Sequence, residues 1–286
     1  MTETTSAVLM DGTAVARRIV EQATADAAAL KAVTGVTPCL ATVLVGADPA
    51  SVTYVRMKQS RSAKAGIDSR HVELPESATT AELVAVLTEL SEDSRVHGIL
   101  LQHPVPAHID ERAAFEAIAP EKDVDGVTMH SFAAMAFGEP GFASATPGGI
   151  MRLLEAYSVE LAGKHAVVVG RSPILGKPVG MLLLARDATV TYCHSKTADL
   201  ASLTRQADVL VAAVGKPRFL TGDAVKPGAV VIDAGYNPGN VGDVDFDSAA
   251  RTASLITPVP GGVGPMTIAV LLEQTVAAAR RQLGRR

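Results

Sequence analysis

Residues Lys164–Leu184 read K-H-A-V-V-V-G-R-S-P-I-L-G-K-P-V-G-M-L-L-L, and this stretch decides the fold. The uninterrupted β-branched run 167–169 is typical of a parallel strand that is buried on both faces. Gly170 allows the backbone to turn after the strand, and apolar residues then resume with helical spacing from Gly176. The stretch therefore predicts a strand, a glycine turn and a helix.

The turn between this strand and helix has the properties of a phosphate-binding turn. N–H groups in the first turn of a helix have no intrahelical partners and carry partial positive charge. Gly176 also allows the helix to approach the sheet or a ligand closely. Glycine in such a turn often serves backbone geometry alone, so the pattern by itself leaves both interpretations open. We expect a nucleotide to bind here, with the substrate brought to it.

Length and composition indicate a two-domain protein without a dominant basic surface. The chain has 286 residues, more than one typical core requires, and 48% of them are hydrophobic. Lys and Arg number 26 and Asp and Glu number 30, which gives a net charge of −4. Nucleic acid is therefore not an expected partner, whereas small acidic or phosphorylated ligands remain possible through local clusters.

The ends of the chain and its cysteines bear on location and on metal sites. The N-terminus, M-T-E-T-T-S-A-V-L-M, lacks the cationic and apolar regions of a signal peptide, and no later segment is long enough to span a bilayer. A cytoplasmic protein that does not bind membranes is expected. Cys39 and Cys193 form no CxxC pair, and His and Cys residues show no zinc spacing, so we expect neither a metal nor a disulfide.

The first half of the chain alternates predicted helices and strands. Asp11 or Thr13 can cap a helix that ends near Gly35, and Asp48 with Pro49 opens a helix that stops at Gly66. A further helix is expected at 80–90, and strands are expected at 40–45, 70–74 and 98–102. This alternation is typical of βαβ units, so the first half is itself an α/β domain.

The second half repeats the α/β pattern after a predicted linker at 138–141. Strands are expected at 189–192, 209–213, 230–233 and around 255–256. The last helix should begin after Pro265 and carry Ile268, Leu271, Leu272 and Val276 on one face. We expect it to pack back on the first domain. The predicted domains are thus 1–143, completed by about 266–286, and 144–265, a Rossmann-like doubly wound parallel sheet.

Three groups of polar residues in the first half are candidates for chemistry. Tyr54 and Lys58 share a face if they lie on a helix, although a surface lysine beside a half-buried tyrosine explains the same spacing. Gln102 follows a predicted strand at the edge where ligands of open α/β sheets bind, or it caps the backbone there. Asp123 and Asp125 flank a turn in which acids commonly cap backbone N–H groups.

The second half favours NADP over NAD. Dinucleotide-binding folds for NAD place an acidic residue about 20 residues past the glycines to hold the ribose 2′-hydroxyl. Here that position reads C-H-S-K-T, with Ser195 and Lys196 and no acid. With Arg171 in the turn, these groups suit a 2′-phosphate. The alternative for Arg171 is a solvated loop residue.

A loop rich in proline and glycine precedes the last helix. It reads T-P-V-P-G-G-V-G-P-M-T over 257–267 and offers backbone N–H groups in a rigid segment. Such a loop can be a simple connector. The loop contains several glycines and no serine, and this composition favours close approach of its backbone to a flat ligand.

Taken together, the motifs of this chain resemble those of one known family. They are Y-V-R-M-K, G-I-L-L-Q-H-P-V-P-A-H-I-D, K-D-V-D-G, G-R-S-P-I-L-G-K-P, C-H-S-K-T, A-V-G-K-P, G-D-V-D-F and T-P-V-P-G-G-V-G-P-M-T, in this order along nearly the whole chain. They resemble the bifunctional methylenetetrahydrofolate dehydrogenase and methenyltetrahydrofolate cyclohydrolase family. The resemblance implies an NADP-dependent cytoplasmic homodimer that acts on tetrahydrofolate derivatives in one-carbon metabolism and purine biosynthesis, with a folate cleft between two α/β domains.

The same resemblance implies roles for individual residues. Catalytic roles carry over onto Lys58, Tyr54, Gln102 and Asp125, with Gln102 tuning the lysine and Asp125 binding the pterin. The implied substrate-binding residues are Leu101, His103, Pro260, Gly261, Gly262, Val263 and Gly264. The implied cofactor-binding residues are Gly170, Arg171, Ser172, Ser195 and Tyr236.

Three positions depart from the family pattern. His103 stands where the family usually has Leu, which makes the surroundings of Lys58 more polar. The segment 144–147 reads S-A-T-P in place of P-C-T-P, which removes a cysteine and keeps the helix cap. Tyr236 replaces a common Ile and adds bulk near the nicotinamide.

Two other functions remain open at this stage. An NADP-dependent dehydrogenase acting on an amino or hydroxy acid would fit the second domain, but it needs a cationic anchor for the substrate carboxylate, which the first domain does not obviously supply. A non-catalytic folate-binding protein is the other alternative. The presence of Lys58, Gln102 and Asp125 together argues against it, whereas His103 keeps it open.

Overall fold

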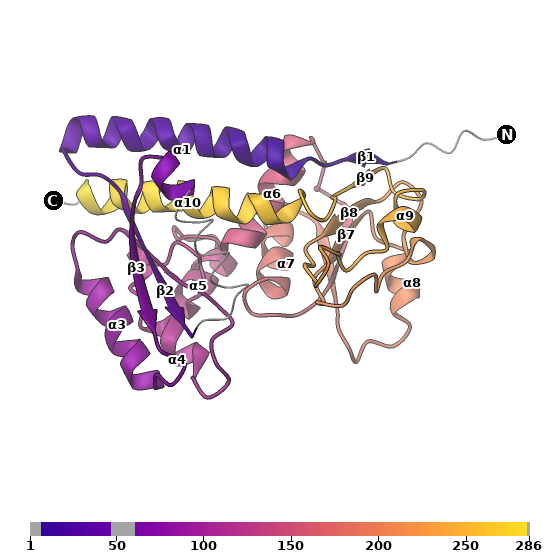
Figure 1. Ribbon diagram of the computed structural model, residues 1–286. Coiled ribbons are helices and arrows are strands. Elements are labelled where there is room, and N and C mark those ends of the chain that lie inside the picture. The colour runs from indigo at the N-terminus through magenta and orange to yellow at the C-terminus, as the bar shows by residue number, and fades with distance from the viewer. Residues whose placement is uncertain (1–6, 47–60, 285–286) are drawn as a thin grey trace. The chain divides into compact units, whose positions relative to one another are not determined.

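A computed structural model describes residues 7–46 and 61–284, which divide into two compact α/β units (Figure 1). One unit comprises residues 1–17 and 146–267, and is called the nucleotide unit below; the other comprises 18–145 and 268–286, and is called the N-terminal unit. This division puts the first 17 residues with the nucleotide unit, whereas the expected boundaries put them with the first half. It falls at Ala145, a few residues past the expected linker, because Phe142 belongs to the core of the N-terminal unit.

The nucleotide unit is built on one parallel sheet of six strands, in the order β1-β9-β8-β7-β5-β6. The strands are β1 (Val8–Leu9), β5 (His165–Val169), β6 (Thr189–Cys193), β7 (Val209–Ala212), β8 (Val230–Asp233) and β9 (Leu255–Ile256). Helices α6 (Ala145–Ala156), α7 (Gly176–Leu184), α8 (Leu200–Thr204) and α9 (Phe246–Ala249) and the 3₁₀ turn η2 (Gly222–Ala224) connect them. This is the predicted doubly wound sheet, with β1 as an unpredicted edge strand.

The valine run of β5 lies in an interior strand of this sheet and is buried, as its sequence predicts. Val167, Val168 and Val169 are each at most 1% exposed. The strand pairs with β6 on one side and with β7 on the other. The chain therefore reverses its direction of winding between β5 and β7, and open α/β sheets bind ligands at such a switch point, beyond the carboxyl ends of the strands.

The N-terminal unit has a parallel sheet of three strands in the order β3-β2-β4. The strands are β2 (Cys39–Val45), β3 (Asp68–Leu74) and β4 (Gly98–Leu101), and the helices are α1 (Gly12–Thr34), α3 (Thr80–Glu92), α4 (Glu111–Glu116) and α5 (Met129–Phe137), with the 3₁₀ turn η1 (Pro120–Lys122). A capping box between Thr79 and Glu82 starts α3, whose Leu83, Leu87 and Leu90 are buried.

The last helix, α10 (Val263–Leu283), begins before the start expected after Pro265, and its residues from Ile268 on belong to the N-terminal unit. Its Ile268, Leu271, Leu272 and Val276 share one hydrophobic cluster with Leu40 of β2 and Leu100 of β4. The helix lies beside α1, and the strands lie between α10 and α3 (Figure 1). Burial of this apolar face, rather than helix propensity, stabilises the position of α10.

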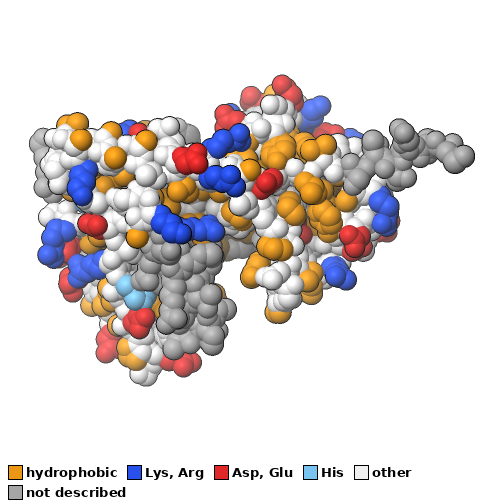
Figure 2. All heavy atoms as spheres, turned by 45° about the horizontal axis from the view of Figure 1, so that its top comes forward, with side chains coloured by type: hydrophobic (Ala, Val, Ile, Leu, Met, Phe, Trp, Pro, Cys, Tyr) orange, Lys and Arg blue, Asp and Glu red, His pale blue; other side chains and the backbone are white. Residues whose placement is uncertain are grey.

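Two further observations concern the distribution of side chains on the surface and the polarity of the helices. Lys and Arg side chains alternate with acidic and hydrophobic ones on the face shown in Figure 2. Within residues 7–46 and 61–284, every helix is too short or too polar to cross a bilayer.

Candidate active site

The glycine turn after β5 forms the carboxyl edge of the sheet at the switch point. Gly170 has a φ of 141°, a conformation that side chains disfavour, and a Cβ at this position would collide with the carbonyl oxygen of Ala213 after β7. A Cβ at Gly176 would lie 2.5 Å from the carbonyl oxygen of Gly170. Both glycines are therefore required for the close packing of turn, helix and neighbouring strand.

The helix that follows this turn begins without a side-chain cap. Its N-cap residue, Leu175, makes no capping hydrogen bond from its side chain. Ser172 accepts the N–H of Lys177 at 3.0 Å through its carbonyl oxygen and the N–H of Ile174 at 3.3 Å through its hydroxyl. Arg171 is exposed beside them. An uncapped helix start next to a guanidinium fits a phosphate group.

Ser195 and Lys196 lie at the end of β6, next to β5, in a hydrogen-bonded turn. The N–H of His194 donates to the hydroxyl of Thr197 at 2.8 Å, and the N–H of Lys196 donates to Nδ1 of His194 at 3.1 Å. Both Ser195 and Lys196 are exposed. The structure thus brings them to the same sheet edge as Gly170 and Arg171, where a hydroxyl and two cations suit a 2′-phosphate.

Tyr236 lies in the loop after β8, which is separated from β5 by β7. The residue is 72% exposed, and its hydroxyl donates to Oδ1 of Asn240 at 2.6 Å. The large side chain expected at this position is therefore accessible at the carboxyl edge. Asp233 and Asp243, which sequence reasoning did not assign, anchor this loop. Asp243 stands in the G-D-V-D-F motif, whereas Asp233 lies outside it.

The proline- and glycine-rich loop before α10 is braced by the start of α1. The N–H of Thr13 donates to the carbonyl oxygen of Gly261 at 3.0 Å, and Gly12 packs so closely on Gly262 that a Cβ would overlap its carbonyl oxygen. Gly261 has a φ of 104°, while Pro260 and Gly264 are exposed and Val263 is buried. The loop is a fixed element of the nucleotide unit.

In the N-terminal unit, Gln102 directly follows β4. Leu101 is 1% and Gln102 9% exposed, and the N–H of Gln102 donates to the carbonyl oxygen of Val43 at 2.8 Å. The side-chain amide of Gln102 donates to the carbonyl oxygen of His103 at 2.9 Å. The half-buried ring of His103 lies edge-to-face with Phe115, with 6.0 Å between the ring centroids. Gln102 and His103 therefore lie together at the carboxyl end of β4, an edge strand of this sheet.

The two acids of the K-D-V-D-G motif differ in their surroundings. Asp123 is fully buried and accepts hydrogen bonds from the N–H groups of Val127 and Thr128 and from the hydroxyls of Thr128 and Ser131, at 2.6 to 3.0 Å. It therefore has the capping role that acids in turns commonly have. Asp125 is half-buried, so its carboxylate is the more accessible of the two.

Lys58 and Tyr54 lie outside the described residues. The residues that follow them, 61–64, are helical, and Gly66 ends this segment with a φ of 68°. The end of this helix at a glycine agrees with the expected stop signal.

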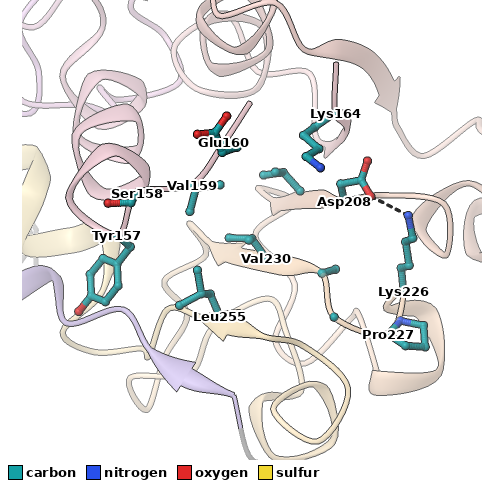
Figure 3. Close-up of a pocket in the computed structure, with 13 residues that line it drawn as sticks. Tyr157, Ser158, Val159, Glu160, Lys164, Asp208, Lys226, Pro227, Val230 and Leu255 are labelled. Carbon is teal, nitrogen blue, oxygen red and sulfur yellow. Dashed lines mark hydrogen bonds and ion pairs between the residues drawn. The ribbon is translucent and has the colours of Figure 1, made fainter. Parts of the chain in front are cut away.

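A pocket of about 260 Å³ opens at the opposite, amino edge of the six-stranded sheet (Figure 3). Lys164, Asp208, Lys226 and Leu255 line it, each at or just before the start of a strand or in a connecting loop. Lys226 pairs with Asp208 at 2.6 Å (Figure 3), and this contact together with the N–H of His165 holds the pKa of Asp208 below its usual range. None of the candidate site residues lines this pocket, so it is distinct from the candidate cofactor edge.

Comparisons with known proteins assign both halves of the chain to one family. The tetrahydrofolate dehydrogenase/cyclohydrolase catalytic domain matches residues 10–125, and the NAD(P)-binding domain of the same family matches residues 144–283. A relative from Streptomyces avermitilis, Bifunctional protein FolD 1, is 75% identical over 284 residues, which cover 99% of each chain.

Solved structures give the same result. The bifunctional methylenetetrahydrofolate dehydrogenase/cyclohydrolase FolD from Campylobacter jejuni is 44% identical, with a TM-score of 0.94 over 96% of this chain and 99% of that chain. The Trypanosoma brucei N5,N10-methylenetetrahydrofolate dehydrogenase-cyclohydrolase, solved with NADP and an inhibitor, is 39% identical, with a TM-score of 0.94 over 97% and 99%. These matches confirm the fold class and the resemblance seen in the motifs: the chain is an enzyme that belongs to the tetrahydrofolate dehydrogenase/cyclohydrolase family.

Proposed function

We propose that this chain oxidises 5,10-methylenetetrahydrofolate to 5,10-methenyltetrahydrofolate with NADP and then hydrolyses the methenyl compound to 10-formyltetrahydrofolate. The observation that carries the proposal is the match of both family domains, in order, along the same chain. One folate site can serve both steps because the product of the oxidation is the substrate of the hydrolysis.

The carboxyl edge of the six-stranded sheet supports NADP as the cofactor. The close packing at Gly170 leaves a turn without side-chain bulk, and Arg171, Ser195 and Lys196 are exposed at the same edge. The guanidinium, hydroxyl and ammonium groups would hold the 2′-phosphate, while Ser172 and the start of α7 would hold the pyrophosphate. When bound, NADP accepts the hydride from the bridging carbon of the folate.

For the folate we assign residues from both units. The half-buried carboxylate of Asp125 suits the N–H and amino groups of the pterin, which present paired donors. Leu101 and His103 would line the pterin site beside Gln102, and the loop Pro260–Gly264 would face the folate. Positioning of the folate is the main requirement of the hydride step, since no proton moves in it.

For the hydrolysis we assign Lys58 to proton transfer. Water must lose a proton as it attacks the methenyl carbon, and the departing ring nitrogen must gain one. A lysine serves both needs when its neighbours lower its pKa towards neutrality. In this proposal Gln102 and Tyr54 orient the Lys58 side chain.

We also infer the oligomeric state, the location and the pathway of the enzyme. It would be a homodimer in the cytoplasm, and it would supply 10-formyltetrahydrofolate to purine biosynthesis. Neither nucleic acid nor a membrane is a partner in this proposal, which is consistent with the net charge of −4.

An assay of the purified chain tests the proposed function. We expect NADPH to form in the presence of 5,10-methylenetetrahydrofolate and NADP, and added 5,10-methenyltetrahydrofolate to disappear faster than its spontaneous hydrolysis. Binding of folate without either reaction would instead identify a non-catalytic folate-binding protein. NADPH formation only with an amino or hydroxy acid would identify a dehydrogenase of another class.

A further inference from the structure

Two buried aspartates, Asp233 and Asp243, lie together at the carboxyl edge of the six-stranded sheet, where the main-chain N–H of Asp243 donates to the carboxylate of Asp233. Asp233 ends β8 and is 4% exposed, and Asp243 is fully buried. Buried carboxylates are costly unless their oxygens are satisfied by hydrogen bonds. The donors that satisfy these two acids are main-chain and amide N–H groups.

The carboxylate of Asp243 ties two loops together. Its Oδ2 accepts the N–H groups of Val214 at 2.6 Å and Gly215 at 2.9 Å, and its Oδ1 accepts the N–H of Lys216 at 2.9 Å. Oδ1 also accepts the side-chain amide of Asn237 at 3.0 Å. The first three donors belong to the loop after β7, and the fourth belongs to the loop after β8.

Asp233 fixes the main chain of Asp243 itself. Its Oδ1 accepts the N–H groups of Gly235 and Asp243, and its Oδ2 accepts the N–H of Val244, each at 2.9 Å. A Cβ at Gly242 would collide with Oδ2 of Asp233, so a glycine is needed there. The carboxylate of Asp233 thus fixes the main chain at Asp243, which keeps the Asp243 side chain in contact with the loop after β7.

The loop held by Asp243 adjoins the candidate cofactor turn. The N–H of Ala213, one residue before Val214, donates to the carbonyl oxygen of Val169 at 2.8 Å, and the carbonyl oxygen of Ala213 lies against Gly170. On the other side, Asn237 follows Tyr236, the exposed residue assigned to the cofactor. A substitution of Asp243 should therefore displace the main chain of both the loop after β7 and the loop that contains Tyr236.

We propose that Asp243 is a positioning residue for the cofactor, which sets the loop Ala213–Lys216 and the Tyr236 loop at the edge where the dinucleotide binds. This inference rests on the proposed function, since it takes the carboxyl edge as the NADP site. A carboxylate is the side chain that fits, because its two oxygens accept all four N–H groups and it presents no donor of its own. An amide would leave its NH₂ group facing N–H donors.

The test compares the full-length Asp243→Asn variant with the unchanged enzyme in both reactions. Hydrolysis of the methenyl compound consumes no dinucleotide, so it reports on folding and on the folate site alone. We expect the KM for NADP to rise by about 10- to 100-fold, as for the loss of hydrogen bonds to a charged group, while hydrolysis changes less than about twofold. The matched control is Asp208→Asn at the amino edge of the same sheet, where the acid also accepts a main-chain N–H, and its KM for NADP should not change.

Equal losses of both activities, or reduced thermal stability with an unchanged KM for NADP, would assign Asp243 a merely structural role and overturn the proposal. If Asp243→Asn does not fold, Asn237→Ala decides the question, because it removes the side-chain hydrogen bonds of Asn237 to Asp243 and to the carbonyl oxygen of Val241 and keeps the bonds of Asp243 to the loop after β7. A KM for NADP raised by about threefold or more with intact hydrolysis supports the positioning role. An unchanged KM overturns it.

Calorimetric titration with NADP separates this proposal from the proposed function. If the unchanged enzyme binds NADP but turns over no folate, the proposed function fails, while weaker NADP binding by Asp243→Asn still supports positioning. Equal NADP binding by the two proteins overturns positioning whatever the reaction.

Discussion

The α-carbon of Gly170 lies against the carbonyl oxygen of Ala213, with no room for a side chain between them. This contact joins the carboxyl ends of β5 and β7 at the point where the order of the sheet reverses. It explains why the valine run of the sequence must be followed directly by glycine. Any larger residue would separate the cofactor turn from the loop that Asp243 holds.

Gly170→Ala should therefore impair the cofactor edge more than a typical glycine substitution does. The φ of 141° and the overlap with Ala213 together should cost about 2 kcal/mol or more of unfolding free energy, and the KM for NADP should rise. The control is Gly163→Ala, which has a φ of 72° but open space around its α-carbon, so that a cost of about 1 kcal/mol is expected. Urea unfolding of both variants measures the difference, and equal costs would show that the contact with Ala213 is unimportant.

Much of the fold can be predicted because its signals are local. The buried strands, the glycine that ends the helix before β3 and the apolar face of α10 are all readable from spacing and composition. The strand β1 is not, because two residues, Val8 and Leu9, carry no periodicity and pair only where β9 is already in place. Helix α5 was missed although Thr128 caps its start and Gly138 ends it with a φ of 72°.

The site is less predictable than the fold, because it depends on contacts between distant segments. Ser195 and Lys196 became candidates through the expected position of the NAD-binding acid, and Arg171 became one through its place in the glycine turn. Asp243 could not, since its partners Val214 and Asn237 are main-chain or amide groups that any sequence offers. Spacing did not distinguish Asp123 from Asp125, and only the family resemblance singled out Asp125; in the structure, burial separates the capping acid from the more accessible one.

Arg171→Ala should weaken NADP binding and leave NAD binding nearly unchanged. Arg171 is exposed at the carboxyl edge, and one charged contact to the 2′-phosphate is worth about 1.5–3 kcal/mol, or about ten- to a hundredfold in affinity. Fluorescence titration with both dinucleotides measures the ratio. Arg186→Ala, an exposed arginine beyond the other end of α7, is a suitable control. Equal losses for NADP and NAD would show that Arg171 does not contact the phosphate.

The Asp208–Lys226 pair at the amino edge should make stability depend on pH. Because the hydrogen bond from Lys226 lowers the pKa of Asp208, the folded state favours the carboxylate. Its stabilising contribution is therefore fully present above the unfolded pKa of about 4 and is lost as pH falls through the lowered folded value. The side chains of Lys226 and Asp208 are 41% and 33% exposed, so Asp208→Asn should cost only about 0.2–1 kcal/mol at pH near 7. Unfolding measured near pH 7 and again near pH 3 should show this cost diminish, and a cost that is the same at both would refute the ionic explanation.

Lys58→Met should separate the two reactions. Hydride leaves a carbon flanked by two nitrogens whose lone pairs stabilise the resulting cation, so the oxidation needs no acid or base. General acid–base catalysis is typically worth about 10²–10⁴-fold, and the hydrolysis should fall by that order while substantial dehydrogenase activity remains. Both activities are measured on the same variant at saturating folate. Lys64→Met, an exposed lysine further along the same stretch, is the control and should retain both. A loss of dehydrogenase activity as deep as the loss of hydrolysis would mean that Lys58 positions the substrate, because a group that only transfers protons has no part in the hydride step.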